Sequence, residues 1–229
     1  MRPLEAVIFD CDGVLVDSEV IAVRVELACL AEIGLHYDPH DFAERFLGQT
    51  HTAFHVELEQ DHHKQFGRPL PTGFPQAMSD KVWAEMSVDV VAVDGVTETV
   101  KALSGAKAVA SSSGLAHLQH KLRHVGLFDA FAPHIYSGEG VARGKPFPDI
   151  YLHAAAQLGI DPARCLAVED SVNGVKSAVA AGMTAVGFIG GGHCSPNLAA
   201  RLKDAGASQV ISSMLDVLSI FGDPIGRVS

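Results

Sequence analysis

The sequence predicts an α/β fold, namely a doubly wound, mostly parallel, Rossmann-like core sheet into which a small α-helical cap domain is inserted. Short, continuous apolar runs suggest strands covered on both faces, as in parallel sheets. They lie at 6–9, 107–110, 165–168, 184–188 and 209–211. Helical patterns separate the later runs, at 96–103, 116–125, 148–158, 172–181 and 196–205. Strand–helix alternation from about residue 90 onward is typical of an open, doubly wound domain.

Residues 17–86 break this alternation, because they are rich in helix formers and contain no convincing buried strand. Segments 20–33 and 41–46 have amphipathic helical patterns, and the Pro- and Gly-rich segment 67–75 predicts a loop. We therefore assign the core domain to residues 1–16 and 89–229 and the cap domain to residues 17–88. Asp17 is expected to cap the first cap helix, and Asp161-Pro162 is expected to start a core helix.

Composition limits the classes of function. The chain has 229 residues, of which 48% are hydrophobic and 19% charged, which suits a globular protein and excludes intrinsic disorder. The formal net charge of −10 argues against nucleic-acid binding. A small anionic substrate stays compatible with this charge if a metal or a lysine reverses the sign in one pocket.

The four cysteines have no CxxC spacing, which favours a reduced, cytoplasmic protein over a disulfide framework or a structural zinc site. Residues 177–200 lack charged side chains, but glycines and Pro196 interrupt them, so we predict buried core and no membrane span. We expect a monomer or a small homo-oligomer.

Polar side chains follow several predicted strands. In open α/β sheets, ligands bind beyond the carboxyl ends of the strands. The residues that would meet there are Asp10, Asp12, Ser111, Ser112, Ser113, Lys145, Glu169 and Asp170. Clustered carboxylates repel one another and usually need a hard divalent cation. Mg²⁺ binds through a few carboxylates, waters and phosphate oxygens, so the pattern predicts a Mg²⁺ site for a phosphorylated substrate.

These residue types suit phosphoryl transfer. An aspartate can accept a phosphoryl group, and a second carboxyl two residues away can protonate the leaving oxygen and then activate water. Ser111 and Lys145 would hold the phosphoryl oxygens, where negative charge accumulates.

Four segments together resemble the signature motifs of the haloacid dehalogenase-like hydrolase superfamily. They are DCDGVLVDSE at 10–19, Ser111, GKPFPD at 144–149 and VEDS at 168–171. The helical insertion after the first motif is similar to that of the β-phosphoglucomutase and phosphoglycolate phosphatase branch. The resemblance covers essentially the whole chain and implies a phosphatase that acts on a small phosphorylated metabolite.

The resemblance also implies roles for individual residues. Asp10 would be the nucleophile and Asp12 the general acid and base. Mg²⁺ would be bound by Asp10, the backbone carbonyl of Asp12 and Asp170, with Glu169 supporting it through water. Ser111 and Lys145 would contact the transferred phosphate, as would the backbone of Ser112. Candidate substrate-binding residues in the cap are Arg24, Gln49, Thr50 and His51.

A sugar phosphomutase of the β-phosphoglucomutase type is the main alternative. Three positions depart from the mutase pattern: Ala22 replaces a helix histidine, His51 replaces a loop arginine, and Gly114-Leu115 replaces a Lys-Asn pair. Hydrolysis is therefore favoured over transfer to a sugar.

Other activities fit less well. A haloalkanoate dehalogenase would lack the aspartate found at Asp12, and neither Lys64 nor Lys81 has the context of a Schiff-base lysine for phosphonate cleavage. A non-catalytic Mg²⁺- or phosphate-binding protein is a further alternative that any metal-dependent turnover would exclude.

The histidines and Cys11 do not indicate a zinc site or a thiol nucleophile. One histidine pair (His51, His55) and one triplet (His117, His120, His124) are better explained as solvated helix faces than as zinc ligands. Residues 193–194 are expected to form a mobile loop, and the Cys11 side chain should point away from the two neighbouring aspartates.

Overall fold

A computed structural model describes residues 3–46, 49, 51–195 and 197–222. Its centre is a six-stranded sheet with the strand order β3-β2-β1-β4-β5-β6, and every pair of neighbours is parallel. The strands are β1 (Ala6–Phe9), β2 (Ala106–Ser111), β3 (Ile135–Ser137), β4 (Cys165–Glu169), β5 (Thr184–Phe188) and β6 (Gln209–Ile211). This is the strand order of a doubly wound dinucleotide-binding type of sheet, and it confirms the predicted fold class.

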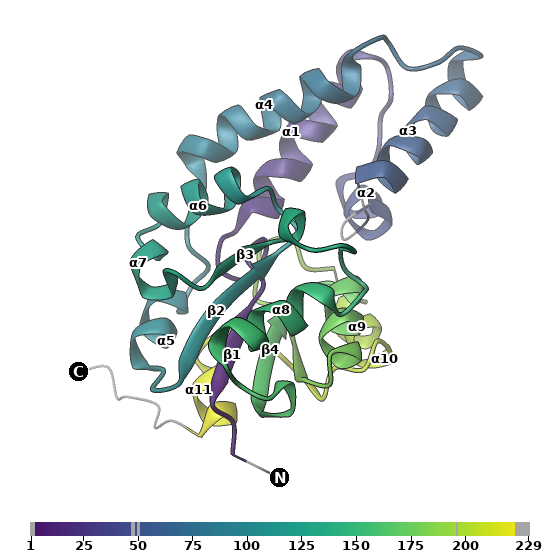
Figure 1. The fold of residues 1–229 in the computed structure, drawn as a ribbon. Helices are drawn as coiled ribbons and strands as arrows, with labels where there is room; N and C mark the ends of the chain where they lie inside the picture. Colours follow the sequence, from purple (N-terminus) through teal and green to yellow (C-terminus); the bar gives the residue numbers. More distant parts are fainter. Residues whose placement is uncertain (1–2, 47–48, 50, 196, 223–229) are drawn as a thin grey trace.

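Both faces of the sheet are buried, which explains why its strands are continuously apolar. Val7 and Phe9 of β1 point into one hydrophobic cluster, whereas Ala6 and Ile8 point into the other. The first cluster also contains side chains of α5 (Val96–Ala102), α6 (Leu115–His124), α7 (Phe128–Phe131) and α11 (Asp216–Phe221). The second contains side chains of α8 (Asp149–Leu158), α9 (Val172–Ala180) and α10 (Leu198–Asp204). Figure 1 shows these helices around the sheet.

Four helices between β1 and α5 form the insertion. They are α1 (Ser18–Glu32), α2 (Pro39–Phe46), α3 (His51–Phe66) and α4 (Phe74–Asp89), and in Figure 1 they extend away from the sheet. The rings of Phe42, Phe46 and Phe54 pack on one another with centroids 4.8–6.1 Å apart. The insertion therefore has apolar contacts among its own helices, and its assignment as a separate cap domain stays a prediction.

Several local predictions need correction. Strand β3 was not predicted, because its three residues follow Pro133 and His134 and form no extended apolar run. Asp161-Pro162 starts only a 3₁₀-helix, Pro162–Arg164, in which the Asp161 side chain accepts a hydrogen bond from Ala163 N. The predicted loop 67–75 ends early, since α4 begins at Phe74 and includes Pro75 in its first turn.

Candidate active site

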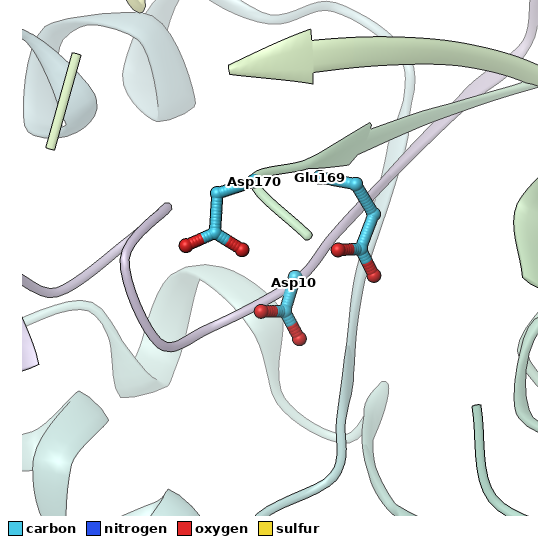
Figure 2. Close-up of side chains that lie close together, drawn as sticks. All are labelled: Asp10, Glu169 and Asp170. Carbon is cyan, nitrogen blue, oxygen red and sulfur yellow. The ribbon is translucent and has the colours of Figure 1, made fainter. Parts of the chain in front are cut away.

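Three carboxylates meet at the carboxyl ends of the two central strands. Asp10 directly follows β1, Glu169 is the last residue of β4, and Asp170 comes next. Because β1 and β4 are paired, with Asp10 N donating to Val168 O at 3.0 Å, these residues lie side by side. One carboxylate oxygen from each lies within 4.8 Å of the others, and Figure 2 shows the three side chains converging. The predicted meeting of β1 and β4 residues is thus present in the structure.

Lys145 bridges two of these carboxylates. Its Nζ donates to Asp10 Oδ1 at 2.7 Å, to Glu169 Oε1 at 2.6 Å and to the carbonyl of Ala110 at 2.9 Å. Its side chain is 6% exposed. Burial alone would lower the pKa of Lys145, but the charges of Asp10 and Glu169 and their hydrogen bonds raise it above its ordinary value. Lys145 is therefore a fixed positive charge at the end of β1.

The carboxylate cluster fits a divalent cation. Burial raises the pKa of Asp10 well above its ordinary value, and the negative charges of Glu169, Asp170 and Asp12 raise it further against the opposing charge of Lys145. Repulsion of this kind is relieved by a cation, and carboxylate oxygens are the hard ligands that Mg²⁺ prefers. Asp10 and Asp170 are placed to supply such ligands directly.

Glu169 is fixed by three side chains. It is fully buried, and its Oε1 accepts from Lys145 and, at 2.6 Å, from the hydroxyl of Tyr151. Its Oε2 accepts from Ser171 Oγ at 3.1 Å. Tyr151 was not predicted as a site residue, because a tyrosine on the apolar face of a helix carries no signal that separates it from a core residue. The N-cap of α9 is Ser171, whose side chain accepts from Gly174 N.

Asp12 lies in a separate hydrogen-bonded group. Its Oδ1 accepts from Ser18 Oγ at 2.6 Å and from Lys121 Nζ, and its Oδ2 accepts from Ser113 Oγ at 2.7 Å. Ser111 Oγ is 3.4 Å from the same Oδ2. Burial opposes ionisation, but the charge of Lys121 and the hydrogen bonds from Lys121, Ser18 and Ser113 lower the pKa of Asp12 to about 2. Asp12 is therefore ionised at neutral pH.

The serines after β2 occupy different environments. Ser111 is the last residue of β2 and is buried, and its Oγ accepts from Ser113 N at 3.1 Å. Ser112 is exposed in the loop that leads to α6. The structure thus brings Ser111 and Ser113 to Asp12, and it leaves Ser112 at the surface of the same loop.

The loop after β5 also reaches the site. His193 Nε2 lies 3.1 Å from Asp170 Oδ2, and both side chains are less than a tenth exposed. Burial favours neutral His193, but the hydrogen bonds of Asp170 and Cys194 and their charges raise the pKa of His193 to about 11. Residues 193–194 lie in a loop, as predicted, but the sequence analysis did not assign His193 to the site, which it reaches through Asp170. Asp17 is also corrected: its side chain does not cap α1, and its Oδ1 instead accepts from Gly192 N at 3.1 Å.

A family model described as haloacid dehalogenase-like hydrolase matches residues 4–182. The chain belongs to this family. It is 29% identical to the 6-phosphogluconate phosphatase of Escherichia coli K12 over 196 residues, covering 86% of this chain and 87% of that protein. It is 32% identical to hexitol phosphatase B of the same strain over 199 residues, covering 81% and 83% of the two chains. A hydrolase of the family from Deinococcus radiodurans R1, solved with bound phosphate and sodium, superposes with a TM-score of 0.82 at 39% identity, over 96% of each chain.

Two of the four cap candidates contact other residues of the insertion, and the other two lack a described side chain. Arg24 on α1 pairs with Glu85 on α4 at 2.7 Å, within the cap. Gln49 Nε2 donates to Glu57 Oε1 and to the carbonyl of Arg45, both at 2.9 Å. Thr50 and the side chain of His51 lie outside the described residues. Their roles stay predictions.

The histidines of α6 touch the cap. His117 and His120 are exposed, as a solvated helix face would be. However, His117 also stacks on Trp83 of α4 with ring centroids 3.6 Å apart, and His120 Nε2 lies 2.9 Å from the carbonyl of Ser87. The description of this face as merely solvated is therefore incomplete, because it also forms part of the contact between α6 and α4.

Among the described residues, no helix combines the length and the apolar character needed to cross a membrane.

Proposed function

We propose that the protein is a Mg²⁺-dependent phosphatase that hydrolyses a small phosphorylated metabolite, such as a sugar phosphate, through an aspartyl-phosphate intermediate. The observation that carries the proposal is the pair of aspartates at the end of β1. Asp10 faces Lys145 and the β4 carboxylates, whereas Asp12 is held separately by hydroxyls and Lys121. The names of two relatives, a 6-phosphogluconate phosphatase and a hexitol phosphatase, support a phosphorylated sugar derivative as substrate.

The reaction would take two steps. In the first, a carboxylate oxygen of Asp10 attacks phosphorus while protonated Asp12 gives its proton to the ester oxygen, which leaves as an alcohol. In the second, the Asp12 carboxylate removes a proton from a water whose oxygen attacks the same phosphorus, which releases inorganic phosphate and the Asp10 carboxylate. Asp12 is ionised in the substrate-free protein, so it must gain a proton before the first step. A phosphate monoester has a second pKa of about 6 and can carry that proton as its monoanion.

Mg²⁺ bound by Asp10, the Asp12 carbonyl and Asp170, with Glu169 in support, would neutralise the negative charge that gathers on the phosphoryl oxygens. Lys145 would hold the same oxygens, and Ser111 would donate to them. The backbone of Ser112 would provide a further donor.

Hydrolysis is favoured over the mutase alternative by an observation at the start of α6. A mutase must grip the second phosphate of a bisphosphate, and the family resemblance would place a Lys-Asn pair at Gly114-Leu115 for that purpose. Here the backbone N of Leu115 donates to Glu139 Oε2 at 3.0 Å. A carboxylate at this helix end repels a second phosphate and occupies a donor that could have bound it.

The experiment that separates the two activities is ³¹P NMR of the protein with β-glucose 1-phosphate, Mg²⁺ and a glucose bisphosphate primer. A phosphatase releases inorganic phosphate, whereas a mutase accumulates glucose 6-phosphate with little free phosphate. A panel of phosphorylated metabolites, run with and without Mg²⁺, then identifies the substrate. Absence of metal-dependent turnover across the panel would favour the non-catalytic binding protein.

We also propose that the protein works in the cytoplasm as a monomer or small homo-oligomer. The free state of all four cysteines, Cys11, Cys29, Cys165 and Cys194, supports a reducing compartment.

A further inference from the structure

Lys121 is a buried charge that the family motifs do not include. It lies on α6, between the fully buried Leu118 and Leu122, and is only 2% exposed. Burying an ammonium group is costly unless it is paired and hydrogen-bonded. Lys121 therefore needs a strong partner inside the protein, and the structure identifies it.

That partner is the second aspartate of the first motif. Lys121 Nζ donates to Asp12 Oδ1 and, at 3.0 Å, to Ser113 Oγ, while Ser113 Oγ donates to Asp12 Oδ2 at 2.7 Å. Ser18 Oγ donates to Oδ1 at 2.6 Å. Lysine, serine and carboxylate thus form a closed ring that engages both oxygens of Asp12. Hydrogen bonds at both oxygens fix the orientation of a carboxylate. A hydrogen bond at one oxygen would leave the carboxylate able to rotate.

The two buried lysines near the site serve different aspartates. Lys145 donates to Asp10 and Glu169, whereas Lys121 donates to Asp12 and Ser113. Loss of Lys121 should therefore affect the proton transfers that involve Asp12 and leave the nucleophile and its carboxylate neighbours in place.

We propose that Lys121 is a positioning residue that orients the Asp12 carboxyl for proton transfer to the leaving group and from the attacking water. The inference rests on the proposed phosphatase function, in which Asp12 is the general acid and base. It assigns to α6 a part in catalysis that does not involve contact with the substrate.

The test uses the dependence of kcat/KM on the leaving group. A poor leaving group, such as the alkoxide of glycerol phosphate, needs a proton from Asp12, whereas p-nitrophenolate leaves without one. General acid catalysis contributes roughly 10²- to 10⁴-fold, so a misplaced acid should lose a sizeable part of that factor. We expect Lys121→Met to lower kcat/KM about 10- to 100-fold for an alkyl phosphate and less than about threefold for p-nitrophenyl phosphate. Phenyl phosphate should lie between the two.

The matched control is Leu122→Ala. Leu122 is the next residue of α6 and is fully buried, but it packs in the hydrophobic core and does not bond to Asp12. This variant should lose stability while keeping the wild-type ratio between alkyl and aryl substrates. Should Lys121→Met fail to fold, Ser113→Ala removes a second member of the ring and should shift the ratio in the same direction by a smaller factor.

The outcomes separate this inference from the proposed function. If the wild type hydrolyses no phosphate monoester with Mg²⁺, the phosphatase assignment fails. If it does, and Lys121→Met lowers kcat/KM equally for every leaving group, leaves it unchanged, or matches Leu122→Ala, only the positioning role of Lys121 is overturned. A loss confined to poor leaving groups supports it.

Discussion

Gly174 provides a test of the buried network around Glu169, because its position in α9 reverses the usual effect of replacing a helical glycine. Alanine in place of glycine inside a helix normally stabilises by about 1 kcal/mol. A Cβ at Gly174, however, would lie 1.9 Å from Glu169 Cδ and Oε2 and 2.1 Å from Oε1. Non-bonded heavy atoms do not approach so closely, so Gly174→Ala must displace the Glu169 carboxylate or the start of α9.

The size of the effect follows from what Glu169 binds. Its carboxylate accepts from Lys145, Tyr151 and Ser171, and it is fully buried. Hydrogen bonds to charged groups contribute roughly 1.5–3 kcal/mol each, so losing two of the three costs roughly 3–6 kcal/mol. Subtracting the helical gain of about 1 kcal/mol leaves a net destabilisation of roughly 2–5 kcal/mol.

The assay is urea denaturation in the presence of a chelator, followed by circular dichroism, with Lys176→Ala as control. Lys176 is exposed on the same helix, so its replacement should change the free energy of unfolding by no more than about 0.5 kcal/mol. Gly174→Ala should also lower phosphatase turnover. Lys145 donates to both Glu169 and Asp10, so a displaced Glu169 carboxylate should disturb the position of Lys145 beside Asp10. A variant as stable and as active as the wild type would refute the reasoning.

Three further predictions concern the nucleophile, the metal and the cap. Asp10→Asn should abolish turnover and beryllofluoride binding while keeping or raising the melting temperature, since it removes one charge from a self-repelling cluster; substantial turnover would contradict the nucleophile assignment. A chelator should remove activity, Mg²⁺ should restore it, and Ca²⁺ should inhibit, because Ca²⁺ favours a higher coordination number; turnover unaffected by the chelator would contradict a metal role for Asp170. Trp83, the only tryptophan, stacks on His117, whose pKa is lowered by burial and by the charge of Lys121. Trp83 fluorescence should therefore titrate with a midpoint below pH 6.5. Lys121→Met should raise that midpoint. An unchanged midpoint would show that the charge of Lys121 does not affect the ionisation of His117.

The meeting of Asp10, Glu169 and Asp170 could be predicted from the sequence because strand ends are local features. A buried parallel strand is a continuous apolar run, and the polar residue that ends it must lie at the carboxyl edge of the sheet. The pairing of β1 with β4, which sets Asp10 directly beside Glu169 and Asp170, was not predicted and is seen only in the structure. The three-residue strand β3 gave no such run and was missed.

Residues that reach the site from helices could not be predicted in the same way. Lys121 and Tyr151 come from α6 and α8, and whether either side chain faces the core depends on the rotation of its helix against the sheet. Lysine at a position flanked by Leu118 and Leu122 does offer a signal, since a charge on an apolar stripe needs a buried partner. The identity of that partner depends on tertiary packing, which a single sequence does not specify.

The charges of the carboxylate cluster favour the binding of a cation together with a phosphoryl substrate. Asp10, Asp12, Glu169 and Asp170 face two buried ammonium groups, Lys121 and Lys145, and the charged imidazole of His193. This leaves a formal excess of one negative charge when all four carboxyls are ionised. Burial and the remaining negative charge raise the pKa of Asp10, so without a cation this residue binds a proton more readily than a free aspartate does. A protonated carboxyl is a poor nucleophile, and a phosphate dianion entering the same site would raise the pKa of Asp10 further. A divalent cation held by these carboxylates would favour the ionised form of Asp10 and would offset the charge of a phosphoryl group, so metal binding and ionisation of the proposed nucleophile would be coupled.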